Sequence, residues 1–196
     1  MPRIISGTAR GTRLQAPHGE KTRPTADRVK EALFSILQAE WPVDGFLDLF
    51  AGTGQIGLEA ASRGASRVVL VEKDRTCLAI IRENILRTHL EAQVCLLGQD
   101  AGRALAGLAE PFGIIFADPP YRQCQTVTGR LAADLARLLA PGGRLILEHD
   151  SRDPAPSFVT NLQLERCCQY GTAMLSFYRR APDGVPMLCQ EEKGGD

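Results

Sequence analysis

Hydrophobic residues fall into short unbroken runs from residue 45 onward, and these runs alternate with segments of helical spacing. The runs that predict strands lie at residues 46–50, 68–71, 94–97, 113–116 and 144–147. Helices are predicted between them at residues 56–62, 75–87 and 126–139. Strands that are apolar along their whole length, separated by helices, indicate a parallel sheet covered on both faces. The pattern therefore predicts an α/β fold.

The first 40 residues follow another pattern. Residues 3–6 and 12–15 alternate polar and apolar side chains on either side of a glycine-containing turn, which predicts a β-hairpin. Thr25 is a candidate N-cap for a helix that extends to about Gln38.

The last 40 residues contain no further helical spacing. Residues 162–166 and 174–178 predict two antiparallel strands that are joined near Gly171 and close the sheet. The remaining residues are polar and rich in glycine and proline. The expected organisation is a basic hairpin extension at 1–24, one domain at 25–180 and a flexible tail at 181–196.

The composition, 44% hydrophobic and 23% charged, is that of an ordinary globular protein. No stretch approaches the roughly 18 apolar residues of a transmembrane helix, and the first residues lack an apolar signal core. We therefore expect a cytoplasmic protein with no membrane partner. Its six cysteines form no C-x-x-C pair, so free thiols and no metal site are expected. Cys77 and Cys95 lie in apolar segments and are expected to be buried.

Charge is unevenly distributed, although the formal net charge is zero. Residues 1–30 contain seven basic and two acidic side chains, a net charge of +5, which leaves −5 on the rest of the chain. A basic segment on an acidic body suits a phosphate-binding surface, but a solvated hairpin without a partner explains the charge equally well. The candidate contacts to nucleic acid are Arg3, Arg10, Arg13, Arg23 and Arg28.

Residues 52–57 match the pattern G-x-G-x-x-G directly after a predicted strand and before a predicted helix. The glycines let the backbone approach a ligand, and the helix N-terminus offers unpaired N–H groups. Glu72 ends the next strand, twenty positions after Gly52, where it can bind ribose hydroxyls. These features fit a nicotinamide cofactor and S-adenosylmethionine equally well.

Two further acids favour S-adenosylmethionine. Asp48 extends the loop to D-x-F-x-G-x-G, which resembles motif I of the class I methyltransferases. A buried carboxylate at this place would repel a diphosphate and attract an ammonium or sulfonium group. Asp100 follows the third strand, where methyltransferases hold the adenine amine; a helix N-cap is the other interpretation, and both can hold together. The expected cofactor contacts are Asp48, Phe50, Gly52, Thr53, Gly54, Glu72, Lys73, Asp100, Ala101 and Thr25.

The fourth strand ends in Asp118, Pro119, Pro120 and Tyr121, the predicted catalytic residues. Asp118 and a proline carbonyl can each accept one N–H bond from an exocyclic base amine, which leaves the nitrogen lone pair pointing outward. Tyr121 offers a ring on which a base stacks, worth about 1–3 kcal/mol. Methyl transfer then needs alignment and electrostatics rather than a covalent intermediate. A simple turn after a strand is the alternative interpretation of this tetrapeptide.

The same tetrapeptide resembles the [N/D]-P-P-[Y/F/W] motif of amino-methyltransferases, and the surrounding sequence resembles the bacterial RsmD family. The segments that carry this resemblance are residues 3–7, 23–25, 27–34, 47–54, 57–60 and 62–65. The resemblance covers about residues 3 to 180, nearly the whole chain. Gln55 and Ile56, where the family has smaller residues, and the acidic tail after residue 181 depart from it.

The resemblance implies a Rossmann-like class I methyltransferase fold, with a seven-stranded, mostly parallel sheet and a hairpin extension that contacts RNA. It implies methylation of the guanine N2 amine in 16S rRNA, at guanine 966, in free RNA or in the assembling small subunit. It also places the segment from Arg23 to Thr25 near the cofactor and the target base. We expect a monomer.

Other functions fit parts of the sequence. An amino-methyltransferase could act on DNA adenine or on a protein glutamine, but such enzymes usually carry an additional recognition domain or a helical N-terminal domain. An RNA-binding assembly factor could keep the cofactor fold without turnover, although the set Asp48, Glu72, Asp100 and Asp118 is intact. A dehydrogenase would need a catalytic His, Lys or Tyr arrangement that the sequence does not offer.

Overall fold

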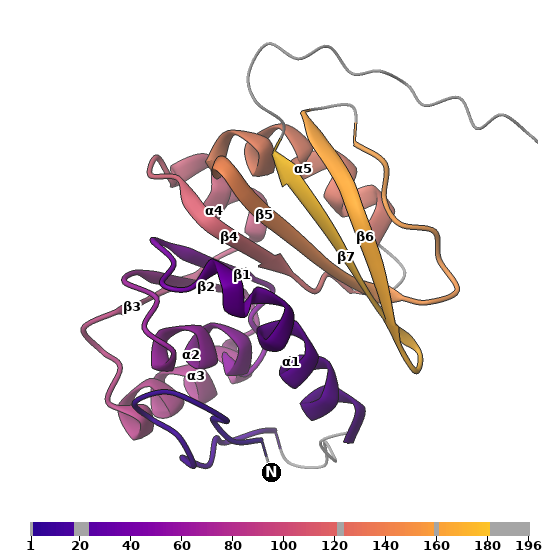
Figure 1. Ribbon diagram of the computed structural model, residues 1–196. Helices are drawn as coiled ribbons and strands as arrows, with labels where there is room; N and C mark the ends of the chain where they lie inside the picture. Colours follow the sequence, from indigo (N-terminus) through magenta and orange to yellow (C-terminus); the bar gives the residue numbers. More distant parts are fainter. Residues whose placement is uncertain (1, 18–23, 121–123, 159–160, 181–196) are drawn as a thin grey trace, which may run out of the picture.

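The computed structural model describes residues 2–17, 24–120, 124–158 and 161–180, and they form one layered α/β unit (Figure 1). The helical elements are α1 (Pro24–Ile36), the short 3-10 helix η1 (Leu37–Glu40), α2 (Gln55–Ser62), α3 (Arg75–Thr88), α4 (Ala101–Gly107) and α5 (Cys124–Leu138). The strands are β1 (Phe46–Leu49), β2 (Val68–Glu72), β3 (Val94–Gly98), β4 (Phe112–Ala117), β5 (Leu139–Asp150), β6 (Leu162–Tyr170) and β7 (Ala173–Arg180).

All seven of these strands join one sheet in the order β3-β2-β1-β4-β5-β7-β6. The first five are parallel, and β7 runs antiparallel to both of its neighbours. This confirms the predicted seven-stranded, mostly parallel sheet. The chain order reverses between β1 and β4, so the carboxyl ends of these two strands form the switch point at which open α/β sheets bind ligands.

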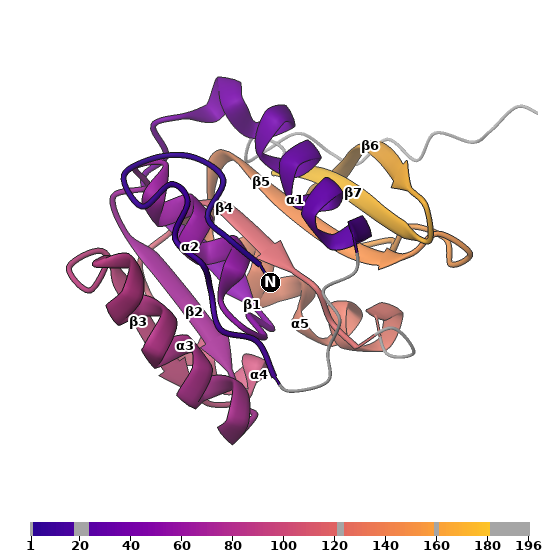
Figure 2. The ribbon, with the colours of Figure 1, turned by 90° about the horizontal axis from the view of Figure 1, so that it is seen from below.

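Helices cover both faces of the sheet (Figure 2). Side chains of α1, α2 and α3 pack with Phe46, Leu70 and Phe116 on one face. Side chains of α4 and α5 pack with Leu47 and Val71 on the other face. The alternation follows from the two-residue period of a strand, and it places Asp48 on the same face as Phe46.

The N-terminal segment folds back on itself and docks on the helices of the first face. Its two arms lie antiparallel, but regular pairing is limited to one bridge, between Arg3 and Arg13. The buried carboxylate of Glu59 on α2 accepts hydrogen bonds from the backbone N–H groups of Ile5 and Ser6, at 2.7 and 3.0 Å. Side chain–backbone bonds to the domain therefore fix the predicted hairpin more than a strand ladder does.

Some predicted boundaries and exposures were wrong. The first helix begins at Pro24, so Thr25 lies inside its first turn rather than at the N-cap. Strand β5 begins at Leu139 rather than at residue 144. Cys95 is exposed because β3 is an edge strand. Nowhere in the described part of the chain is a helix both long and apolar enough to span a membrane.

Candidate active site

Two adjoining cavities open at the switch point. The first, of about 270 Å³, is lined by Phe50, Val71, Glu72, Lys73, Gln99, Asp100, Ala101, Asp118, Pro119 and Pro120. The second, of about 260 Å³, is lined by Pro17, Val29, Lys30, Asp48, Phe50, Ala51, Gly52, Thr53, Gln55, Ile56, Cys77, Phe116, Asp118 and Glu148. Phe50 and Asp118 line both cavities, so Asp118, one of the predicted catalytic residues, lies where the two cavities meet.

Asp48 lies at the floor of the second cavity. Its side chain is 1% exposed, and it accepts a 2.9 Å hydrogen bond from the backbone N–H of Gly57. Burial raises the pKa of Asp48 to about 8, against the lowering effect of that bond, and the nearby acids Asp118 and Glu72 raise it further. A cation bound in this cavity would favour the ionised carboxylate.

The glycine loop wraps around the end of β1. Gly52 and Gly54 have φ values of +56° and +78°, in the left-handed region that glycine tolerates. Gly57 must be small for another reason, because a Cβ there would lie 2.1 Å from Leu70 Cδ2. The loop therefore turns sharply at Gly52 and Gly54, and Gly57 lets α2 pack closely against β2.

Glu72 connects this loop to β2. Its Oε2 accepts a hydrogen bond from Gly52 N at 2.8 Å, and its Oε1 accepts from the backbone N–H groups of Lys73 and Asp74. The carboxylate is thus held in one orientation at the edge of the first cavity. Carboxylate oxygens have lone pairs to spare beyond these three bonds, so Glu72 can still accept from hydroxyl groups.

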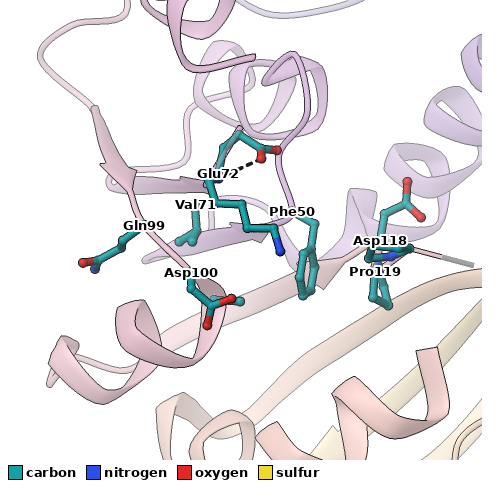
Figure 3. Close-up of a pocket in the computed structure, with 10 residues that line it drawn as sticks. Phe50, Val71, Glu72, Gln99, Asp100, Asp118 and Pro119 are labelled. Carbon is teal, nitrogen blue, oxygen red and sulfur yellow. Dashed lines mark hydrogen bonds between the residues drawn. The ribbon is translucent and has the colours of Figure 1, made fainter. Parts of the chain in front are cut away.

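Asp100 and Phe50 form the remainder of the first cavity (Figure 3). Asp100 Oδ1 accepts a 2.9 Å hydrogen bond from Gly102 N, so this residue is the N-cap of α4 and also lines the cavity. Both sequence interpretations of Asp100 are therefore compatible with its position. In Figure 3 the Phe50 ring lies between Asp100 on one side and Asp118 with Pro119 on the other.

Asp118 follows β4 and its side chain is exposed to the cavities. Protein packed around the cavities nevertheless displaces much of the surrounding water, and this loss of solvation raises the pKa of Asp118 above the ordinary carboxyl range. Pro119 is buried, whereas Pro120 is exposed. The fourth predicted catalytic residue, Tyr121, lies outside the described residues.

Glu148 was not predicted. It lies on β5 and lines the second cavity together with Asp48 and Asp118. Loss of solvation and the negative charge of Asp118 both raise its pKa. A signal was present in the sequence, since Glu148 ends the apolar run of the fifth strand as Asp118 follows that of the fourth.

Lys30 was also not predicted as a site residue. Its side chain is fully buried, lines the second cavity and donates a 2.7 Å hydrogen bond from Nζ to the backbone carbonyl of Arg3. Lys30 therefore links the cavity wall to the docked N-terminal segment.

The arginines predicted to bind RNA, where the structure describes them, line neither cavity. Arg3, Arg10, Arg13 and Arg28 are exposed, and Arg3 and Arg13 are neighbours across the single bridge. Arg23 and the side chain of Thr25 lie outside the described residues. Of the predicted cofactor contacts, Gly54 is buried and lines neither cavity.

Residues 2–179 match the model of one protein family, described as Conserved hypothetical protein 95. The chain belongs to this family. This match, together with the two relatives that follow, confirms the resemblance to RsmD found in the sequence. "Ribosomal RNA small subunit methyltransferase D" of Escherichia coli is 33% identical over 187 residues, which are 93% of this chain and 91% of the relative. "Putative rRNA methyltransferase YlbH" of Bacillus subtilis is 33% identical over 181 residues, 91% of this chain and 98% of the relative.

Solved structures of similar proteins agree with the observed topology. "Putative methyltransferase yhhF from Escherichia coli" is 36% identical and superimposes with a TM-score of 0.78, covering 91% of this chain and 97% of that chain. The fold of the RsmD-family chain is accordingly the Rossmann-like class I methyltransferase fold.

Proposed function

We propose that this RsmD-family chain transfers a methyl group from S-adenosylmethionine to the exocyclic N2 amine of a guanine in 16S rRNA. The observation that carries the proposal is the position of Asp118, at the junction of two cavities at the sheet's switch point. The names of the RsmD and YlbH relatives support ribosomal RNA as the substrate.

The lining residues fit a cationic cofactor better than a diphosphate. The second cavity contains three carboxyl groups, Asp48, Asp118 and Glu148, against one ammonium group, that of Lys30, so that its acidic side chains outnumber the basic one and disfavour phosphate oxygens. S-adenosylmethionine, when bound, supplies a methyl group that its sulfonium makes electrophilic. Asp48 and the glycine loop would hold the methionine end, while Glu72 and Asp100 would accept hydrogen bonds from the ribose hydroxyls and the adenine amine.

Asp118 would prepare the target amine. As a carboxylate it accepts one N–H bond, and the carbonyl of a neighbouring proline accepts the other, so that the nitrogen lone pair points toward the electrophilic carbon. The two prolines limit backbone motion at this corner. After transfer, the nitrogen must lose one proton, and Asp118 is an acceptor within the same cavity.

The exposed arginines of the docked N-terminal segment would bind RNA phosphates. Arg3, Arg10 and Arg13 lie on a segment that Glu59 fixes to α2. Arginine guanidinium groups at fixed positions orient a phosphate backbone without reading its bases. The segment would therefore align the RNA, and the cavity would select the base.

The direct test is incubation of the protein with labelled S-adenosylmethionine and either naked 16S rRNA or small subunits that lack this methyl group. Digestion to nucleosides should identify N2-methylguanosine, and primer extension should map it to one position, with Asp118→Ala as the inactive control. Label in adenosine, in DNA or in protein would assign another target. Cofactor binding without transfer to any of these substrates would support the assembly-factor interpretation instead.

A further inference from the structure

We propose that Glu148 selects guanine by accepting the N1–H of the target base while Asp118 accepts from its N2 amine. The inference rests on the proposed function, because it assigns the base specificity of that same cavity. It begins with the positions of two acids on neighbouring strands.

Strand register sets Asp118 and Glu148 side by side. Ala117, the last residue of β4, pairs with Leu147 of β5 in parallel; Asp118 directly follows β4, and Glu148 is the next residue of β5. Neighbouring strands lie about 4.8 Å apart, and aligned residues point to the same face of the sheet. Both acids accordingly line the second cavity, on the face that also carries Asp48 and Phe116.

Asp118 and Glu148 are two like charges side by side rather than an acid paired with a base. Glu148 is half-buried, and both its loss of solvation and the negative charge of Asp118 raise its pKa. Two adjacent carboxylates repel each other, and such an arrangement gains stability when a ligand offers N–H donors to both. The cavity is therefore complementary to an edge with two adjacent donors.

Among the bases of RNA that carry an exocyclic amine, guanine alone has that edge. Guanine presents the N1–H next to its N2 amine, whereas adenine and cytosine present a ring nitrogen lone pair next to theirs. The pKa of Glu148 is raised to about 8, and above that pH Glu148 is an ionised carboxylate, which has no proton to donate to a lone pair. Adenine or cytosine in this orientation would leave Glu148 facing another acceptor, and an unpaired buried polar group discriminates strongly against a ligand.

The test compares guanine with 2-aminopurine, which keeps the N2 amine but has a lone pair at N1. The substrate is the ribosomal RNA segment that the wild-type protein methylates, prepared with either base at the target position. Above a pH of about 8, where Glu148 is ionised, wild-type protein should prefer guanine strongly. Because an amide can either donate or accept, Glu148→Gln should lower the ratio of kcat/KM for guanine over 2-aminopurine by about tenfold or more. Glu91→Gln changes an exposed glutamate that lines neither cavity and serves as the matched control.

Each outcome separates the two proposals. Failure of the wild-type protein to methylate a guanine overturns the proposed function. Guanine methylation with an unchanged base ratio in Glu148→Gln overturns the role of Glu148 alone. A weakened affinity for S-adenosylmethionine in calorimetry, with an unchanged base ratio, would instead make Glu148 a cofactor contact and also overturn the inference.

Discussion

The buried carboxyl group of Asp48 accepts a 2.9 Å hydrogen bond from the backbone N–H of Gly57, and this contact joins β1 to the first turn of α2. A Cβ on Gly57 would lie 3.3 Å from the Cβ of Asp48 and 2.1 Å from Leu70 Cδ2. The strand and the helix can therefore approach closely enough for the bond only with glycine at this position. The glycine loop that follows β1 takes its course from this contact.

The pH dependence of stability should reveal Asp48. Its pKa is about 8 in the folded protein, against about 4 when unfolded. The folded state thus binds the proton more tightly, so the contribution is fully present below pH of about 4 and is lost as pH rises toward about 8. Urea denaturation at pH 5 and pH 8 should show a loss on the order of a few kcal/mol for wild type and a smaller loss for Asp48→Asn. The exposed Asp153→Asn is the control, and equal losses in wild type and Asp48→Asn would contradict the assignment.

Asp118→Ala should separate chemistry from cofactor binding. Loss of the acceptor that orients the amine should lower kcat by about 10²–10⁴. The affinity for S-adenosylmethionine, measured by calorimetry, should change by less than about threefold, because we propose that other lining residues hold the cofactor. An equal loss of both quantities would make Asp118 a cofactor residue.

Gly7 and Gly11 test how the N-terminal segment is docked. Both have positive φ values, +83° and +86°, so alanine costs about 1 kcal/mol of backbone strain at either position. A Cβ on Gly7 would also lie 1.7 Å from the backbone oxygen of Ser62, whereas one on Gly11 meets nothing within 4 Å. Gly7→Ala should therefore expose the amides of Ile5 and Ser6 to hydrogen exchange, and Gly11→Ala should leave them protected. Equal protection in both variants would mean that the segment is held elsewhere.

The exposed arginines of this segment should set the salt dependence of RNA binding. Reversal of charge in Arg10→Glu with Arg13→Glu removes two proposed phosphate contacts and should reduce the slope of log K against log salt by about 1–2. Arg130→Glu, on α5 at the opposite face of the sheet, is the control with one reversed charge. An unchanged slope in the double variant would exclude the segment as the RNA surface.

Much of the fold was predictable because its information is local. Each apolar run and each helical spacing lies within about fifteen consecutive residues, and the D-x-F-x-G-x-G motif begins in its strand and continues directly into the loop. The switch point, and with it Asp48, Glu72, Asp100 and Asp118, could therefore be located from sequence. The position of β7 between β5 and β6 could not, because strand order depends on which edges pair after the chain collapses.

Contacts between distant residues were likewise not predictable. Glu59 bonds to backbone groups more than fifty positions earlier in the chain, and Asn84 Oδ1 accepts from Gln15 N across 69 positions. Glu59 lies in one of the segments that carry the family resemblance, but that segment does not indicate its partners, and Asn84 lies in none of them. Glu148 was missed because an acid after an apolar run is a weak signal by itself, and it was the strand register next to Asp118 that showed its place in the site.

That alignment should also appear in the pH dependence of catalysis. Asp118 must be ionised to accept from the amine, and its pKa is raised, so kcat/KM should rise with pH above the ordinary carboxyl range. Loss of solvation raises the pKa of Asp118 to about 6, and the charge of ionised Asp118 helps to raise the pKa of Glu148 to about 8, so Glu148 is still neutral while Asp118 ionises. The acid limb near pH 6 should accordingly stay in place in Glu148→Gln, and a second ionisation near pH 8 should be absent from this variant but present in Glu91→Gln. A first limb that moves to lower pH in Glu148→Gln alone would contradict this order of ionisation.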